Sequence, residues 1–181
     1  MPSETLTILD SCVLLNLAAS DEIADIIASI DGATFVCTAA RKEALFLRDQ
    51  TDAGVLVPLA IDDLLGGARI QVSDLATDDE EEQFVLLARD LDDGEAMSMA
   101  IAASRGMRFA SDDQKARRVF VDLVSSPARL ISTSDILKRW AETHAVTPQR
   151  LRDALRRIGV RARFTPSRRD PNAFWWQQSM R

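Results

Sequence analysis

Histidine and cysteine are scarce in this sequence, and their scarcity excludes several kinds of site. The chain has 181 residues, with one histidine, His144, and two cysteines, Cys12 and Cys37. Two cysteines are too few for a disulfide framework, and they form no Cys-x-x-Cys pair. One histidine argues against a His-rich zinc site and against a Ser-His-Asp triad built on Ser11. Nucleophilic and zinc chemistry are therefore poor explanations of this chain.

Long apolar runs are also missing. No stretch approaches the roughly 18 consecutive apolar residues of a membrane span, and the opening residues carry no basic stretch typical of a signal peptide. Hydrophobic residues make up 46% and charged residues 28% of the chain, which is a globular composition. We therefore expect a soluble, cytoplasmic protein that does not contact a membrane.

Charge is unevenly distributed along the chain. The net charge is −6, but residues 1–137 hold 11 Lys and Arg against 25 Asp and Glu, a net of −14. Residues 138–181 hold 11 against 3, a net of +8. This change of sign predicts a first domain over 1–137 and a basic, aromatic-containing extension over 138–181, which face different partners.

Short apolar runs alternate with helical patterns over most of the chain. This alternation predicts the α/β class, with a mainly parallel sheet and helices on both faces. The expected strands cover 5–10, 34–37, 68–72, 107–110 and 129–131. The expected helices cover 12–19, 22–30, 38–49, 77–90, 95–104, 113–123 and a basic stretch from 148 to 157. Gly159 is expected to stop the last of these helices.

Acidic residues stand where such a sheet would bring them together. Asp10 ends the first expected strand, and Asp112 and Asp113 follow the strand 107–110. Glu43 and Glu95 lie in the expected helices 38–49 and 95–104. The carboxyl ends of parallel strands form the working crevice of an open α/β sheet, so these acids should converge. Packed carboxylates repel unless a cation neutralises them, and oxygen ligands favour Mg²⁺ or Mn²⁺. The alternative is that these acids are helix caps or solvated surface residues.

Some of these acids lie in segments that resemble the four motif blocks of PIN-domain proteins. The segments are ILDSCVLLNLA at 8–18, ARKEAL at 40–45, LDDGEAMSMAIAASRG at 91–106 and FASDDQKARRVF at 109–120. The resemblance covers about residues 5–135, and it is carried by the order and spacing of the blocks together. The family includes VapC-like toxins and predicted nucleic-acid-binding PIN proteins. Its fold is a three-layer sandwich, which is what the resemblance implies here.

The resemblance also implies a function and its ligands. It implies a metal-dependent ribonuclease that cleaves RNA phosphodiester bonds with water activated by Mg²⁺ or Mn²⁺, in the role of the toxin of a toxin–antitoxin pair. RNA, an antitoxin protein and a second copy of this chain are then the expected partners. By position, Asp10, Glu43 and Glu95 match the first three family acids. Glu95 stands where the family usually has Asp before Ala.

The fourth family acid has two candidates here. Asp112 and Asp113 both follow strand 107–110, and counting from Glu95 favours Asp113. The resemblance makes Asp10, Glu95 and one of this pair the metal ligands, with Glu43 as a further catalytic acid. Ser11 and Asn16 match polar positions that lie near the metal in the family.

The region after Trp140 is rich in arginine and ends in aromatic residues. Arginines with interleaved aromatics can follow a phosphate backbone and stack on bases, so RNA contact is expected here. The candidate residues are Arg150, Arg156, Arg157, Arg161 and Arg163. The competing explanation is that the basic segment neutralises the acidic body, while Trp175 and Trp176 fill an apolar groove or a dimer seam.

Two other functional classes remain as alternatives. One is a catalytically inactive PIN-like module that binds RNA or protein. The other is a haloacid-type phosphatase, which also begins with an Asp at the end of its first strand. That class needs a second Asp two residues later, and this chain has Cys12 at that position.

Overall fold

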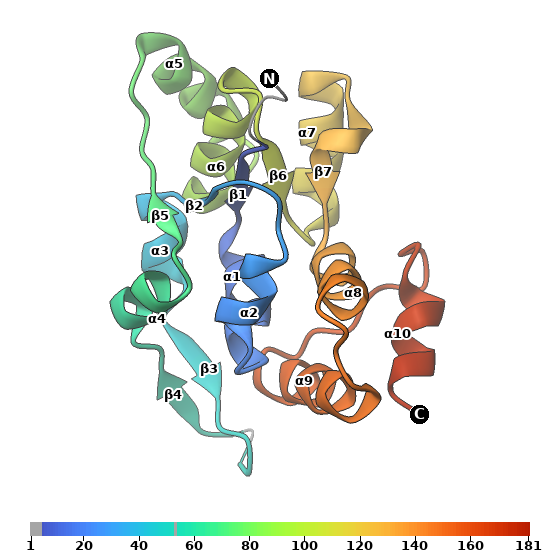
Figure 1. Cartoon of the computed structure of the whole chain (residues 1–181). Coiled ribbons are helices and arrows are strands. Elements are labelled where there is room, and N and C mark those ends of the chain that lie inside the picture. Colours follow the sequence, from blue (N-terminus) through green and yellow to red (C-terminus); the bar gives the residue numbers. More distant parts are fainter. Residues whose placement is uncertain (1–4, 53) are drawn as a thin grey trace.

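A parallel sheet forms the centre of the molecule. The computed structural model describes residues 5–52 and 54–181; residues 1–4, with which the expected first domain begins, and residue 53 lie outside this description. The sheet has five strands in the order β5-β2-β1-β6-β7, and every neighbouring pair is parallel (Figure 1). These strands are β1 (Thr7–Leu9), β2 (Thr34–Val36), β5 (Gln71–Val72), β6 (Arg108–Ala110) and β7 (Leu130–Ile131).

Helices flank this sheet, which confirms the predicted α/β class. They are α1 (Ser11–Ala19), α2 (Ile23–Ala28), α3 (Thr38–Glu43), α4 (Ile61–Gly67), α5 (Asp78–Leu87), α6 (Asp93–Ser104), α7 (Gln114–Val124), α8 (Thr133–Thr143), α9 (Pro148–Arg161) and α10 (Ala173–Ser179). Helix α6 packs on β1 and β6 and also contacts α3, α5 and α7. Helix α1 contacts α2, α8 and α9. The arrangement is consistent with a three-layer sandwich (Figure 1).

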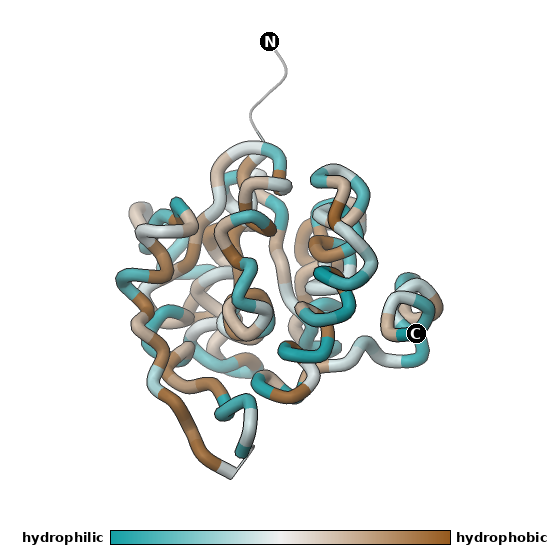
Figure 2. The backbone as a smooth tube through the Cα atoms, turned by 60° about the horizontal axis from the view of Figure 1, so that its bottom comes forward, coloured by the Kyte–Doolittle hydropathy of each residue, from teal (hydrophilic) through white to brown (hydrophobic). Residues whose placement is uncertain are grey.

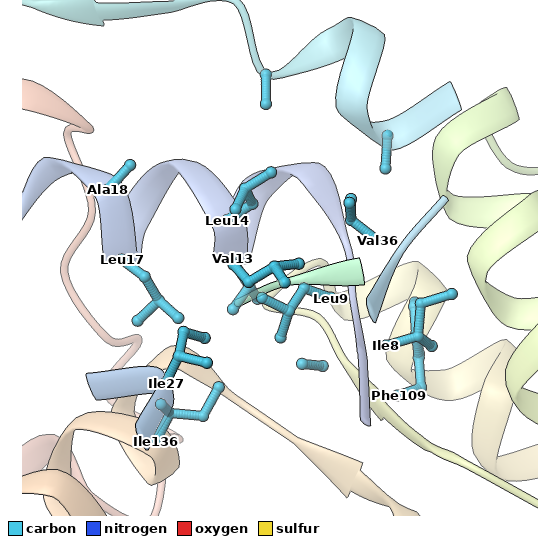
Figure 3. Close-up of a cluster of buried hydrophobic side chains, with 14 of the residues drawn as sticks. Ile8, Leu9, Val13, Leu14, Leu17, Ala18, Ile27, Val36, Phe109 and Ile136 are labelled. Atoms are coloured by element: carbon cyan, nitrogen blue, oxygen red, sulfur yellow. The ribbon is translucent and has the colours of Figure 1, made fainter. Parts of the chain in front are cut away.

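The core explains why the strands read as short apolar runs. Ile8, Leu9, Val36 and Phe109 are fully buried, and they pack with side chains of α1, α2 and α8 (Figure 3). Strands that are covered on both faces need apolar side chains at successive positions rather than at alternate ones. Strand β1 is the middle strand of the sheet, so the residue that follows its carboxyl end lies at the middle of the carboxyl edge.

Small polar residues begin most of the longer helices. Each accepts a hydrogen bond from a backbone N–H of the first turn, which would otherwise have no partner inside the helix. These residues are Asp10 for α1, Thr77 for α5, Asp92 for α6, Asp113 for α7, Ser132 for α8 and Thr147 for α9. Helices α1, α7 and α8 begin within four residues of the ends of β1, β6 and β7, so their first residues lie near the carboxyl edge of the sheet.

The helix predicted over 38–49 is wrong in its second half. Helix α3 ends at Glu43, and an antiparallel hairpin of β3 (Phe46–Arg48) and β4 (Leu56–Pro58) follows. Asp49 closes the end of β3 by accepting hydrogen bonds from the backbone N–H and the hydroxyl of Thr51, at 2.8 and 2.7 Å. An Asp side chain that bonds the following backbone in this way favours a turn over a continued helix. The hydrogen bonds between β3 and β4 then stabilise the hairpin on both sides of the turn.

The basic helix also differs from its prediction, because α9 runs through Gly159 to Arg161. A glycine inside a helix costs only about 1 kcal/mol, and the buried Leu155 and Ile158 hold this last part in place. Within residues 5–52 and 54–181, no helix is long and apolar enough to cross a membrane.

The expected boundary at residue 137 falls inside α8. Trp140 follows on the same helix, is fully buried and donates a hydrogen bond from Nε1 to Asp25 at 2.8 Å. Helix α9 packs against α1, and Trp176 of α10 is buried against Phe164 with ring centroids 5.7 Å apart. The basic segment therefore shares its apolar core with the acidic part of the chain.

Candidate functional site

Asp10 lies directly after β1, at the carboxyl edge of the sheet. Its side chain accepts hydrogen bonds from Ser11 N at 2.7 Å, from Ser111 Oγ at 3.0 Å and from Cys12 Sγ at 3.2 Å. The residue is only 1% exposed. Burial raises the pKa of Asp10 to about 6, and the hydrogen bonds limit this increase. Asp10 is therefore a buried carboxyl group held in one orientation at the end of the central strand.

Glu43, the last residue of α3, reaches across to the start of α6. Its Oε1 accepts a hydrogen bond from Gly94 N at 3.0 Å. A Cβ atom at position 94 would lie 2.4 Å from Glu43 Oε2, so this glycine leaves the space that the carboxylate occupies. Although much of Glu43 is exposed, partial burial of its carboxylate raises its pKa. A hydrogen bond from the Ser11 side chain opposes this rise, and the charge of Asp92 adds to it.

Glu95 lies in the first turn of α6 and is partly buried. Burial is the main cause and the negative charges of Asp92, Asp10 and Asp113 add to it; together they raise the pKa of Glu95 to about 7. These charges come from separate segments of the chain. Ser111 joins two of these segments, because its Oγ donates to Asp10 at 3.0 Å and accepts from Asp113 N at 3.2 Å.

Asp92 also belongs to this group of acids, although it is not among the candidate acids predicted from the sequence. It caps α6, where its side chain accepts a hydrogen bond from Glu95 N at 2.8 Å. Its charge raises the pKa of Asp10, of Glu43 and of Glu95. The signal in the sequence is the Asp-x-x-Glu spacing of 92 and 95, which is typical of a helix start and places both acids side by side.

Asp112 and Asp113 point to different surroundings. Asp112 accepts hydrogen bonds from Asn16 Nδ2 at 2.9 Å and from Thr133 N at 3.0 Å. Asp113 caps α7 through Oδ1, which accepts from the backbone N–H groups of residues 115 and 116. Burial raises the pKa of Asp112, and these hydrogen bonds oppose the rise. The charge of Asp113 is among the causes that raise the pKa of Glu95.

Cys12 and Thr133 complete the surroundings of these acids. Burial raises the pKa of the Cys12 thiol well above its usual range, and the charges of Asp10 and Asp112 raise it further. The thiol is therefore neutral and unsuited to act as a nucleophile. Sequence reasoning missed Thr133, whose hydroxyl donates to Asp112 Oδ2 at 2.5 Å and accepts from Asn16 Nδ2 at 3.2 Å. Asn16 thus orients Asp112.

The chemistry of these donors suits a hard divalent cation, because the ligands that they offer are carboxylate oxygens. Across the described ranges 5–52 and 54–181, however, no group of three or more His, Cys, Asp or Glu side chains is arranged to hold a metal ion. Asp10, Asp112 and Asp113 each accept hydrogen bonds from protein groups instead. Binding a cation therefore requires side chains to exchange some of these hydrogen bonds for metal contacts.

Comparison with known proteins adds no relative. No family model, curated protein or solved structure matches this chain. The interpretation of the carboxylates therefore depends on their own positions, their burial and the motif spacing described above.

Several candidate RNA-binding arginines pair with acids around the end of α1 and the start of α2. Arg150 binds Glu22, with 3.0 Å between Nε and Oε1, and its guanidinium lies 5.3 Å from the centre of the Trp140 ring. Arg157 donates from Nε to the carbonyl oxygen of Ser20 at 2.7 Å. These contacts match the explanation in which the basic segment neutralises acidic groups of the body.

Arg161 behaves in the same way, whereas two other arginines do not. Arg161 donates to the carbonyl oxygen of Ala19 at 3.1 Å and forms an ion pair with Asp21. Arg156 and Arg163 are exposed and make no hydrogen bond or ion pair with the described part of the chain. Arg156 and Arg163 are thus the candidates whose charge is available to a ligand.

Proposed function

We propose that this chain is a metal-dependent ribonuclease with a PIN-like site. The observation that carries the proposal is the gathering of Asp10, Glu43, Glu95 and Asp113 around Asp92 at one edge of the sheet. Their charges repel one another, and a divalent cation is the simplest partner that would neutralise them. In an open α/β sheet this edge is also where ligands bind.

The residues support different parts of this activity. Asp10, Glu95 and Asp113 would hold the ion, with Asp112 as the alternative to Asp113. When bound, Mg²⁺ or Mn²⁺ would supply Lewis-acid activation of water for attack on phosphorus. Asp10 and Asp113 are oriented by the backbone N–H groups that they cap, and Glu43 by Gly94 N. Carboxylates held in this way lose little conformational freedom when they bind a ligand.

The PIN-like fold with a basic helical extension and the role of toxin in a toxin–antitoxin pair belong to the same proposal. The motif blocks support it, because each of them contains at least one of the candidate acids. RNA is the proposed substrate, and an antitoxin and a second copy of the chain are the proposed protein partners.

A catalytically inactive PIN-like module is the second candidate. The observation that favours it is that both oxygens of Asp10 already accept hydrogen bonds, from Ser11 N and from Ser111 Oγ and Cys12 Sγ. In such a module the carboxylates would be structural caps, and the chain would bind RNA or protein without cleaving it.

Manganese titration separates the two candidates. Thermal unfolding is followed as Mn²⁺ is added to wild type, to Asp10→Asn and to Asp122→Asn. Asp122 is an exposed acid on α7 without a hydrogen bond to the described residues, so it serves as a charge-matched control. Metal binding to the folded state alone stabilises it by about 2.7 kcal/mol at a hundredfold excess over the dissociation constant.

The ribonuclease proposal expects Mn²⁺ to stabilise wild type and Asp122→Asn but not Asp10→Asn. It also expects RNA cleavage that needs both Mn²⁺ and Asp10. If Mn²⁺ stabilises none of the three proteins and RNA remains intact, the proposal fails and the inactive module is left.

A further inference from the structure

Two depressions meet at Asp112 and Phe164, beside the carboxylates. One has a volume of about 490 Å³ and lies between α1, the β3–β4 hairpin and the end of α9. The other, of about 280 Å³, lies between the start of α7 and the segment that leads to α10. Both are lined by Asp112 and Phe164, so the two depressions adjoin at these residues, and Asp113 lines the larger one; the two together are called the groove below.

The outer wall of this groove is the segment 161–171, which runs from α9 to α10 (Figure 1). Hydrogen bonds to α8 fix its far end: Asp170 accepts from Ser134 Oγ at 2.8 Å, and Asn172 Nδ2 donates to Asp135 at 2.7 Å. Burial of Trp176 against Phe164 fixes the wall from behind. The wall is therefore part of the folded body.

Positive charge on this wall is available to a ligand. Arg163 lines the larger depression and Arg169 the smaller one. Both are exposed, and neither makes a hydrogen bond or ion pair with residues 5–52 or 54–181. The groove thus places two unpaired guanidinium groups on a wall opposite the acids Asp112 and Asp113.

The hairpin supplies exposed apolar side chains at the other end of the groove. Phe46 is 49% and Leu56 is 55% exposed, and both line the larger depression. In Figure 2 the hairpin projects from the body, with hydrophobic residues along one side and hydrophilic residues on the other side near its tip. Aromatic and apolar surfaces next to arginines are typical of sites that stack unpaired bases while binding the phosphates of the same strand.

We propose that this groove holds an unpaired nucleic-acid strand, with phosphates on Arg163 and Arg169 and a base on Phe46. The inference deepens the proposed ribonuclease function and depends on it for the choice of ligand. It assigns the C-terminal segment a place in the substrate groove, and it selects arginines other than Arg150, Arg157 and Arg161, which face α2.

A charge-matched pair of variants tests the phosphate contacts. Binding of a fluorescent oligouridine of about a dozen nucleotides is measured by anisotropy in EDTA, over a range of salt concentrations. The double variant Arg163→Gln/Arg169→Gln is compared with Arg89→Gln/Arg118→Gln, which removes the same charge from exposed positions outside the groove. We expect the groove variant alone to lose affinity and to lower the salt slope by about 1.4, since each phosphate contact on a single strand contributes about 0.7.

A second pair tests the base contact. Phe46→Ala removes the side chain in the groove, whereas Phe174→Ala removes a phenylalanine that is 71% exposed on α10. We expect Phe46→Ala to weaken binding of the oligouridine roughly tenfold and to leave binding of an abasic strand of the same length unchanged. Phe174→Ala should leave both unchanged.

The outcomes separate this inference from the proposed function. If the two arginine double variants lose equal affinity for the oligouridine, or if the two phenylalanine variants change it equally, the proposal that the groove binds the strand is wrong. This holds even if Mn²⁺-dependent cleavage is present. Selective losses in the groove variants without any cleavage would sustain the groove and remove the ribonuclease. Thermal unfolding of each variant confirms that the protein is folded when binding is measured.

Discussion

Asp10 and Glu95 hold their protons to an unusually high pH for carboxyl groups. Burial is the main cause in both cases, and like charges add to it. A raised pKa in the folded state means that the folded protein binds more protons than the unfolded chain between the two pKa values. The free energy of unfolding therefore falls as the pH rises through this interval.

The pH dependence gives the first prediction. Without metal, wild type should lose stability relative to Asp10→Asn between about pH 4, where Asp10 ionises in the unfolded chain, and about pH 7. The shift of Asp10 from 3.8 to about 6 sets an upper limit of about 3 kcal/mol on this loss. Urea unfolding in EDTA at several pH values measures it. A difference that does not change with pH would show that Asp10 is ionised without cost in the folded protein.

Replacing Asp112 by Asn should lower the stability of the protein more than replacing its neighbour Asp113. In Asp112→Asn the new amide cannot accept from both Thr133 and Asn16, so we expect a loss of about 1–3 kcal/mol in stability. Asn caps helices as well as Asp does, so Asp113→Asn should change stability by less than about 0.5 kcal/mol.

Cleavage should show the reverse order. Because the charge of Asp113 raises the pKa of Glu95, we expect Asp113→Asn to lower RNA cleavage by about a hundredfold or more, and Asp112→Asn by about tenfold or less. Initial cleavage rates in Mn²⁺, taken per folded molecule, check this order. Larger loss in Asp112→Asn would make Asp112 the ligand and Asp113 a cap only.

The contact between the end of α3 and the start of α6 depends on one missing side chain. The three atoms nearest to a Cβ atom at Gly94 would be the carboxylate atoms of Glu43, at 2.4 to 2.8 Å. Gly94→Ala should therefore displace the Glu43 carboxylate and lower cleavage as much as Glu43→Gln does. Stability should hardly change, because alanine favours helix by about 1 kcal/mol and offsets the lost hydrogen bond.

Gly66→Ala is the matched control for this prediction. It adds the same methyl group to α4, where a Cβ atom would meet nothing within 4 Å. Its cleavage rate should equal that of wild type. If Gly94→Ala also cleaves at the wild-type rate, the position of Glu43 does not matter for catalysis.

The central elements could be predicted because their signals are local. A buried parallel strand such as β1 needs consecutive apolar residues, and a helix start needs a side-chain acceptor such as Asp10. The β3–β4 hairpin could not be predicted, because its strands are short and partly exposed and depend on pairing with each other. Helix α10 likewise depends on Trp176 finding a groove that distant segments build.

The candidate site was predictable to the level of residue positions but not of orientation. Strand ends place Asp10 and Asp113 at one edge, as the topology demands. That Asp112 turns toward Thr133 depends on a helix 21 positions later in the chain, and no spacing in the sequence contains that information. Asp92 belongs to the group of carboxylates because it caps α6, and this position brings it next to Glu95.

The two oppositely charged parts of the chain form one folded body. Arg150, Arg157 and Arg161 hold α9 against acids near α2, and Leu151, Leu155 and Ile158 of the same helix are buried with the side chains of the sheet and α1. A separate basic arm would instead leave such apolar residues in water. Arg163 has no such partner, and it lines the depression that also contains Asp112 and Asp113.

One core implies one unfolding transition, which is the last prediction. Trp140, Trp175 and Trp176 report on the region after residue 137, whereas far-UV circular dichroism reports on helices of the whole chain. Because Trp140 and Trp176 belong to the same cluster as Ile8 and Phe109, fluorescence and circular dichroism should give the same urea midpoint and the same slope. Removing residues 146–181 would uncover the buried α1 face beneath α9 and should abolish cooperative unfolding of the remainder. Two separate transitions in the full chain, or a cooperative unfolding of residues 1–145 alone, would show that the basic segment folds as an independent extension.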